Sequence, residues 1–269
     1  MAKNAGVTDD LSVRLIPRVD AVGWRSHPKT GGRSDMVDTL GGRQVQRHAP
    51  IREQVAAIIR DAIVEMRLEP GHLLVERQLC EMTGASRPSV REALRQLEAE
   101  SLVISVNGRG TYVAVPDLAM ARGVFEASTE LEGVAAEVFV TRSTADERAA
   151  IRAAIDAFAA AVAADEDAVE LYGLISRFFD ILLGGTRNTV LAQMIGQLHN
   201  RISSLVIQGL RVPGRPARAL SELSAIVQSI ESYDPAASRR AAASYAQQVA
   251  HATFTLLAAE PAPPSHDPA

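Results

Sequence analysis

Three arginines stand four residues apart in the first half of the chain, at Arg87, Arg91 and Arg95. In a helix, which advances about 100° per residue, they fall within about 80° of one another and form one basic face. A planar guanidinium can donate two hydrogen bonds to guanine, and Ser86 and Ser89 at the start of this segment can donate to phosphates. The spacing indicates a helix that contacts DNA in the major groove. The alternative is a solvated arginine face paired with nearby glutamates.

The preceding sequence predicts the elements that hold this helix. Apolar residues recur at three- and four-residue steps over 51–66, which is typical of an amphipathic helix, and Glu76–Thr83 is expected to form a second helix of about two turns. A tight turn follows at Gly84-Ala85. Ser86 is the expected N-cap of the arginine helix, because its side chain can accept a hydrogen bond from an exposed amide of the first turn.

A hairpin is expected directly after the arginine helix. Two β-rich runs are separated by Asn107-Gly108-Arg109-Gly110, a strong turn signal because Asn and Gly accept positive φ. The glycines beside Arg109 would let the backbone approach DNA closely. Helix, helix, turn, helix and hairpin is the order of a winged helix-turn-helix, so residues 49–116 are predicted to be a domain that binds double-stranded DNA. The two predicted strands are 102–106 and 111–115.

The segment between Leu68 and Val113 resembles the DNA-binding domain of the GntR family of bacterial regulators. The matching pieces, in order, are Pro-Gly before Leu, Glu-Arg-x-Leu, Gly-x-Ser-Arg-x-x-Val-Arg-Glu-Ala-Leu and the Gly-x-Gly wing. The resemblance implies binding of short palindromes as a homodimer. The DNA contacts that it implies are Arg77, Arg87 and Arg91 and, at the wing tip near the minor groove, Asn107 and Gly108.

Residues 117–259 predict an all-helical bundle. Thr144 and Glu147 form a capping box that opens one helix, and ten of the sixteen residues over 149–164 are alanine, which permits close helix contact. The fold class expected for the chain is therefore mainly α, with an N-terminal winged helix-turn-helix (α+β) followed by an all-α bundle. Six or seven helices are expected, separated at Gly184-Gly185, 212–216 and 233–235.

The bundle is similar to the FCD domain, a ligand-sensing and dimerisation domain that follows the winged helix in one large subfamily of GntR regulators. The supporting fragments are Leu131-Glu132, Phe178 ten residues before Asn188, and Ser229-Ile230-Glu231-x-x-Asp234-Pro235. Many such domains hold a divalent metal through an Asp and a His four residues apart and two later His, and the metal helps to bind a small carboxylate.

The chain departs from that pattern at all four metal-ligand positions, which hold Ile175, Phe179, Leu223 and Tyr245. Aliphatic and phenyl groups cannot coordinate a metal and a neutral tyrosine does so poorly, so we expect no metal and no other cofactor. A cavity lined by these four residues favours an aliphatic effector, such as a fatty acid or acyl-CoA, because buried apolar area contributes about 25 cal/mol per Å². The alternatives are a small organic acid, or side chains that fill the site so that no ligand binds.

Composition adds limits on the function. The 269 residues carry a net charge of −4, which gives no indication of a nucleic-acid partner. That total averages a basic segment over 1–48, expected to be a disordered tail, with an acidic bundle. Residues 260–269 are expected to be a Pro-rich tail.

The remaining signals concern compartment and chemistry. The single cysteine, Cys80, excludes an intramolecular disulfide, and neither a membrane span nor a signal peptide is evident, so we expect a cytoplasmic protein without a membrane partner. No GxSxG, HExxH, P-loop or GxGxxG motif is present, which argues against an enzyme. A protein-interaction adaptor built on the bundle is the competing interpretation.

Overall fold

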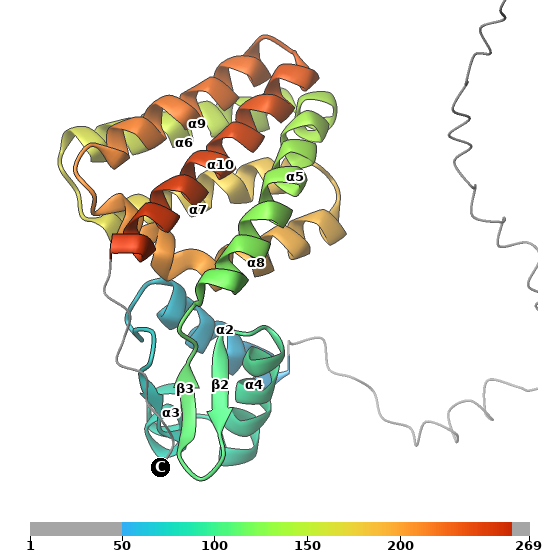
Figure 1. Cartoon of the computed structure of the whole chain (residues 1–269). Coiled ribbons are helices and arrows are strands. Elements are labelled where there is room, and N and C mark those ends of the chain that lie inside the picture. The colour runs from blue at the N-terminus through green and yellow to red at the C-terminus, as the bar shows by residue number, and fades with distance from the viewer. Residues whose placement is uncertain (1–49, 260–269) are drawn as a thin grey trace, which may run out of the picture. The chain divides into compact units, whose positions relative to one another are not determined.

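The computed structural model describes residues 50–259, so the segments predicted to be tails, 1–48 and 260–269, lie outside the described residues. The first part of the described chain is a winged helix-turn-helix with a three-stranded antiparallel sheet in the order β1-β3-β2 (Figure 1). This confirms the predicted order of elements. Its elements are α2 (Ile51–Val64), β1 (Leu73–Leu74), α3 (Glu76–Thr83), α4 (Arg87–Ala99), β2 (Val103–Val106) and β3 (Gly110–Val113).

Local sequence signals explain where these elements begin and end. The Ser86 side chain accepts a hydrogen bond from the Ser89 amide at the start of α4, and Gly84 ends α3 in the left-handed region with φ of 67°. Two glycines with positive φ, Gly108 at 72° and Gly110 at 112°, turn the chain between β2 and β3. The hairpin therefore forms at the predicted tetrapeptide, with each strand one residue shorter than expected and β3 beginning one residue earlier, at Gly110.

One apolar core holds the winged helix together. The buried stripe of α4 packs with the buried face of α2 and with the sheet, and Cys80 of α3 is half-buried against the same cluster. Burial of these side chains removes apolar area from water and fixes α4 with its opposite face toward solvent. The principal members of the core are Val55, Ile59, Leu74, Val90, Leu94, Leu97 and Val113.

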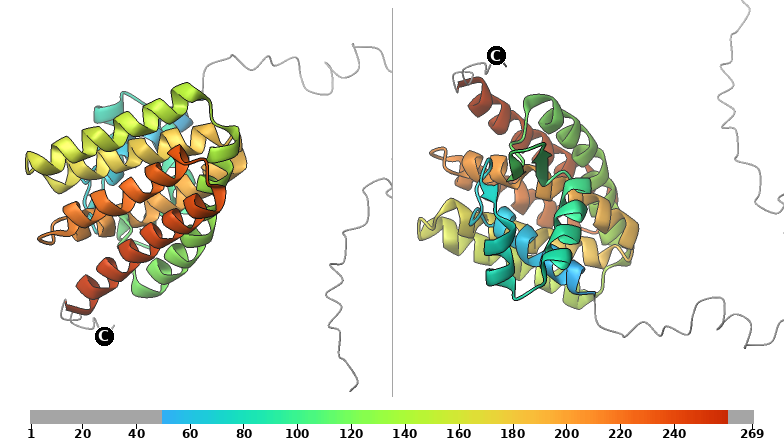
Figure 2. Two further views of the ribbon diagram at one scale, coloured as in Figure 1. Left: turned by 90° about the horizontal axis from the view of Figure 1, so that it is seen from above. Right: turned by 90° about the horizontal axis from the view of Figure 1, so that it is seen from below.

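A bundle of six helices follows within the described residues, in line with the expectation of six or seven. α10 lies beside α5, as both Figures 1 and 2 show, and α9 contacts α6 and α10. None of the helices in residues 50–259 is both long and apolar enough to cross a membrane. The bundle helices are α5 (Leu118–Arg142), α6 (Ala145–Ala163), α7 (Ala168–Gly185), α8 (Thr189–Leu210), α9 (Arg215–Glu231) and α10 (Pro235–Ala259).

Two predicted boundaries in the bundle are shifted by a few residues. Gly184-Gly185 forms the last two residues of α7 and not the linker itself, and the chain turns directly afterwards, at Arg187, with φ of 56°. A Cβ on Gly185 would overlap the ring of Phe139, so this glycine permits close packing of α7 against α5. The helix α9 starts at Arg215, inside the predicted separator 212–216, directly after a left-handed Gly214.

Candidate DNA-binding surface and effector cavity

The arginine face of α4 lies on the outside of the winged helix. Arg87, Arg91 and Arg95 are all exposed, while Val90 and Leu97 on the opposite side are fully buried. The helix therefore separates an apolar face that packs from a basic face that is free to meet a polyanion. Such a face can contact phosphates and base edges without first being uncovered.

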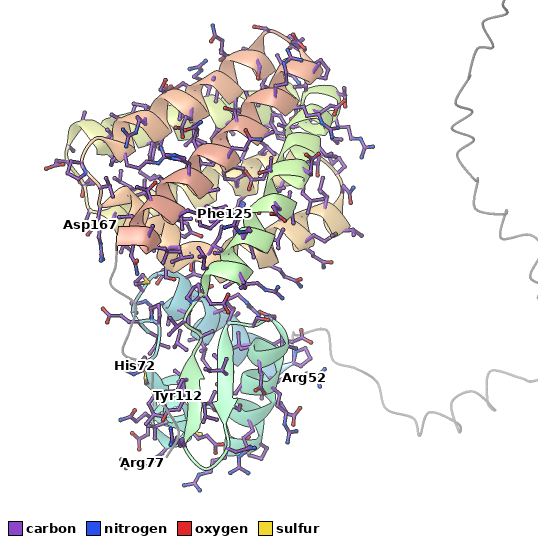
Figure 3. All side chains as sticks on the ribbon, in the orientation of Figure 1. Arg52, His72, Arg77, Tyr112, Phe125 and Asp167 are labelled. Carbon is purple, nitrogen blue, oxygen red and sulfur yellow. The ribbon has the colours of Figure 1, made fainter. Side chains whose placement is uncertain are left out.

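Acidic side chains form ion pairs with several of the arginines predicted to contact DNA. Arg91 donates from Nε to both carboxylate oxygens of Glu76 at 2.9 and 3.0 Å, and this hydrogen bond with the nearby charge raises the pKa of Arg91. Arg77, which follows Glu76 on α3, lies 3.5 Å from Glu81, and Figure 3 shows its side chain pointing outward. Bound phosphates would have to replace these exposed pairs, which are weak in water.

The wing carries the remaining predicted DNA contacts. Asn107, Gly108 and Arg109 are exposed at the β2–β3 turn, and Ser86 and half-buried Ser89 share a 2.9 Å hydrogen bond at the start of α4. Within the described chain, neither Arg109 nor Arg87 has an ion-pair partner, so both guanidinium groups are available to a ligand. The predicted assignment of these residues to DNA contacts stays a prediction.

The wing also has a support that the sequence pattern did not indicate. The hydroxyl of Tyr112 donates to the carbonyl of Arg109 at 3.1 Å. This bond ties the tip of the turn to β3 and limits the directions in which Arg109 can point. A tyrosine at this position of the sequence is equally typical of an exposed β-strand, so its role was not predictable.

Three of the four predicted effector residues meet at one cavity in the bundle. Ile175, Phe179 and Tyr245 line it together, whereas Leu223 is fully buried in the core and does not reach it. Phe125, labelled on α5 in Figure 3, closes another side. The free volume is about 30 Å³, which is roughly the volume of one water molecule in the liquid.

A buried acid and a histidine give this cavity a polar side. Glu132 on α5 is 4% exposed, and its Oε1 lies 2.8 Å from Nε2 of His199 on α8. Its second oxygen, Oε2, and the hydroxyl of Ser128 have no hydrogen-bond partner among the described residues. Burial raises the pKa of Tyr172 to about 12 and also raises the pKa of Tyr245. The cavity is therefore apolar with one acidic edge, and it is not a uniform lipid-like pocket.

A helix that lines the cavity also contacts the end of α4. Arg201 of α8 donates from Nε to the carbonyl of Glu100, the C-cap of the arginine helix, at 3.0 Å. The carboxylate of Glu100 in turn accepts two hydrogen bonds from Arg60 of α2 at 2.7 and 2.8 Å. His199 and Arg201 thus connect the cavity and the DNA-binding helix through one rigid element.

Comparison with known proteins decides the family. Residues 51–113 match the model of the bacterial regulatory proteins of the gntR family, and residues 123–248 match the model of the FCD domain. The chain belongs to the GntR family and carries an FCD domain. This family consists of transcriptional regulators rather than enzymes, and its winged helix binds DNA.

Relatives of known sequence support this placement. The mannosyl-D-glycerate transport/metabolism system repressor MngR of Escherichia coli is 43% identical over 67 residues, which are 24% of this chain and 28% of that protein. The chain spans only about a quarter of the length of the relatives that it matches in this way. An uncharacterized HTH-type transcriptional regulator of Mycobacterium tuberculosis is 26% identical over 215 residues, 72% of this chain and 86% of that protein.

Solved structures show the same fold. E. coli McbR/YncC has a TM-score of 0.69 at 19% identity, with 78% of this chain and 100% of that chain covered. A GntR regulator from a Rhodococcus species has a TM-score of 0.65 at 20% identity, covering 78% and 99%. At these identities the likeness establishes the fold of the FCD regulators and nothing about the ligand.

The residues present do not fit the divalent metal that many FCD domains hold. Ile175 and Phe179 have no donor atoms, and no group of three or more His, Cys, Asp or Glu side chains that could hold a metal occurs within residues 50–259. Glu132 and His199 supply two donors, and each is engaged with the other. A structural or catalytic metal normally needs at least three protein ligands, so these two donors do not make a metal site.

Proposed function

We propose that this protein is a ligand-responsive transcriptional repressor of the cytoplasm that binds a palindromic operator as a homodimer. The observation that carries the proposal is the exposed arginine face of α4 above a fully buried apolar stripe. Two relatives that match over 67 and 77 residues, MngR of E. coli and NagR of Bacillus subtilis, are repressors, which favours the same sign of regulation here.

The experiment for DNA binding uses fragments that the protein enriches from its own genome. We expect Arg91→Ala to weaken specific binding about tenfold to a hundredfold, because a guanidinium that contacts a base edge or phosphate is lost. Fluorescence anisotropy at fixed salt measures both affinities. Arg177→Ala, which removes an exposed arginine of α7 in the bundle, is the matched control and should bind DNA like the wild type. Undiminished specific binding by Arg91→Ala would contradict the assignment of α4, and the absence of any specific complex would favour an adaptor.

We further propose that the effector is an aliphatic or lipid-like molecule, such as a fatty acid or acyl-CoA. The apolar residues at the former metal positions, Ile175, Phe179 and Tyr245, support this class. Because the free volume is only about 30 Å³, such a ligand enters only when lining side chains move. That movement couples ligand binding to the conformation of the bundle. A ligand shifts the equilibrium between two conformations only by the difference in its affinity for them.

Native mass spectrometry of the purified chain tests the effector class. Saturable binding of an aliphatic acid in preference to a small hydroxy acid is the expected result. Tightly bound zinc or nickel, or preference for the small hydroxy acid, would contradict the proposal. A Phe179→Ala variant, which enlarges the cavity, should bind the aliphatic ligand at least as well as the wild type.

A further inference from the structure

A second and larger hollow lies between α9 and α10, away from the metal positions of the family. Its free volume is about 320 Å³, within the range of about 300–1,000 Å³ typical of small-molecule sites. We call it the α9–α10 groove. Val212, Arg215 and Glu222 line one side, and Ala252 and Leu256 of α10 line the other.

Arg215 is the unusual member of this groove. Its side chain is 5% exposed, and it is placed there because α9 begins at this residue, directly after the left-handed Gly214. An arginine is rarely buried without partners for its five N–H donors. Here Nη1 is buried and has no hydrogen-bond partner among the described residues, so this donor is left for a ligand to satisfy.

Glu222 is the acid nearest to Arg215, and it satisfies this arginine only in part. Nη2 of Arg215 lies 2.9 Å from Oε2 of Glu222, yet that oxygen lacks an aligned hydrogen bond. Burial raises the pKa of Glu222, and the two nearby arginines, Arg215 and Arg218, only partly oppose the shift. Arg215 and Arg218 line the groove together with this single acid, so the net positive charge of the groove favours an anion.

A narrow cavity shares lining residues with both the groove and the effector cavity. Arg215 and Ala252 belong to both the groove and this narrow cavity, and Ile175 and Tyr245 belong to both the narrow cavity and the effector cavity. The hydroxyl of Thr253, which also lines the narrow cavity, is buried without a partner. Occupation of the groove can therefore reach the effector cavity through shared walls.

We propose that the α9–α10 groove binds an aliphatic monocarboxylate, with its carboxylate reaching the unpartnered Nη1 of Arg215 when the lining side chains shift and its hydrocarbon along Val212, Ala252 and Leu256. The inference rests on the proposed effector class and places the ligand in the groove, beside the effector cavity. A carboxylate is favoured at Arg215, because charge-assisted hydrogen bonds to a guanidinium are strong. The same group is disfavoured in the effector cavity, where the buried Glu132 would repel it.

Binding of octanoate and 1-octanol to the full chain, measured by isothermal titration calorimetry, tests the proposal. These probes share a hydrocarbon chain and differ in charge, so the wild type should bind octanoate at least about tenfold more tightly. Arg215→Met/Glu222→Gln removes the cation without leaving an unpaired buried acid, and it should abolish that preference. Arg211→Met changes an exposed arginine outside the groove and should preserve it.

A third variant keeps the test decisive if the double variant unfolds. Glu222→Gln removes the competing acid and leaves Arg215 in place, so it should bind octanoate at least as tightly as the wild type. Weaker octanoate binding by Glu222→Gln would overturn the Arg215 site. Equal binding of octanoate and 1-octanol by the wild type would overturn the site but leave the aliphatic effector standing, whereas binding of neither probe would overturn both.

Discussion

The winged helix and the bundle differ in where their notable charged side chains lie, exposed in the first and buried in the second. In the winged helix the arginines of α4 are exposed above a wholly apolar core, whereas Glu132 and Arg215 of the bundle are about 95% buried. Every buried polar or charged side chain found in residues 50–259 belongs to the bundle. Exposed charges are available to a large polyanion without a desolvation cost, while buried charges destabilise the fold unless a partner or a ligand compensates them. The first arrangement suits DNA, and the second suits a small molecule.

The largest effect should come from breaking a buried pair in the bundle. His199→Ala removes the partner of Glu132 and leaves the acid buried alone, so the free energy of unfolding should fall by about 3 kcal/mol. Urea denaturation followed by circular dichroism measures the change.

A double variant separates the cost of an unpaired charge from the cost of lost packing. Glu132→Leu/His199→Leu should be close to the wild type in stability, because apolar residues of similar size often replace a buried pair without loss. A His199→Ala variant as stable as the wild type would show that water or a neighbouring group satisfies Glu132, and the contrast between the two domains would disappear.

A steric change in the bundle should have an intermediate effect. Gly185→Ala inserts a methyl group against the buried ring of Phe139 and should cost about 1–3 kcal/mol of the free energy of unfolding. Gly184→Ala is the matched control, since a Cβ at this position meets nothing within 4 Å, and alanine is the better helix former. Thermal denaturation of the two variants should therefore shift in opposite directions, and equal shifts would refute the close α5–α7 contact.

The smallest effect on stability is expected on the arginine face. Arg95→Gln removes an exposed side chain that is bonded, among the described residues, only to Glu92, so the free energy of unfolding should change by less than about 0.5 kcal/mol. DNA binding should nevertheless weaken, and the slope of log K against log salt should fall by about one if Arg95 contacts a phosphate. An unchanged slope would remove Arg95 from the predicted interface.

Local chemistry made much of this fold predictable. Ser86 and the Thr144–Glu147 capping box form the expected N-caps, and Asn107-Gly108-Arg109-Gly110 forms the expected turn. These signals work over three or four residues, so the rest of the chain cannot easily override them. The family resemblance also predicted three residues of the effector cavity, because the fold fixes the positions at which other family members place their metal ligands.

Features that depend on tertiary packing were not predictable. Gly185 ends α7, as a glycine near a break suggests, but its close contact with the ring of Phe139, which is far away along the chain, left no local signal. Glu132 and His199 meet across 67 residues, and the burial of Arg215 depends on how α9 and α10 pack. Charged residues in a helical sequence ordinarily indicate solvent, so no local pattern distinguishes these three from exposed ones.

The single cysteine of the sequence allows the winged helix to be probed separately from the bundle. Cys80 is half-buried against the winged-helix core and has no counterpart in the bundle, so a thiol reagent reports on one domain alone. Because the thiol is partly buried, its labelling rate depends on how closely α3 packs against the core. Followed with and without an aliphatic acid, that rate would show directly whether a ligand in the bundle changes the local opening of the DNA-binding domain.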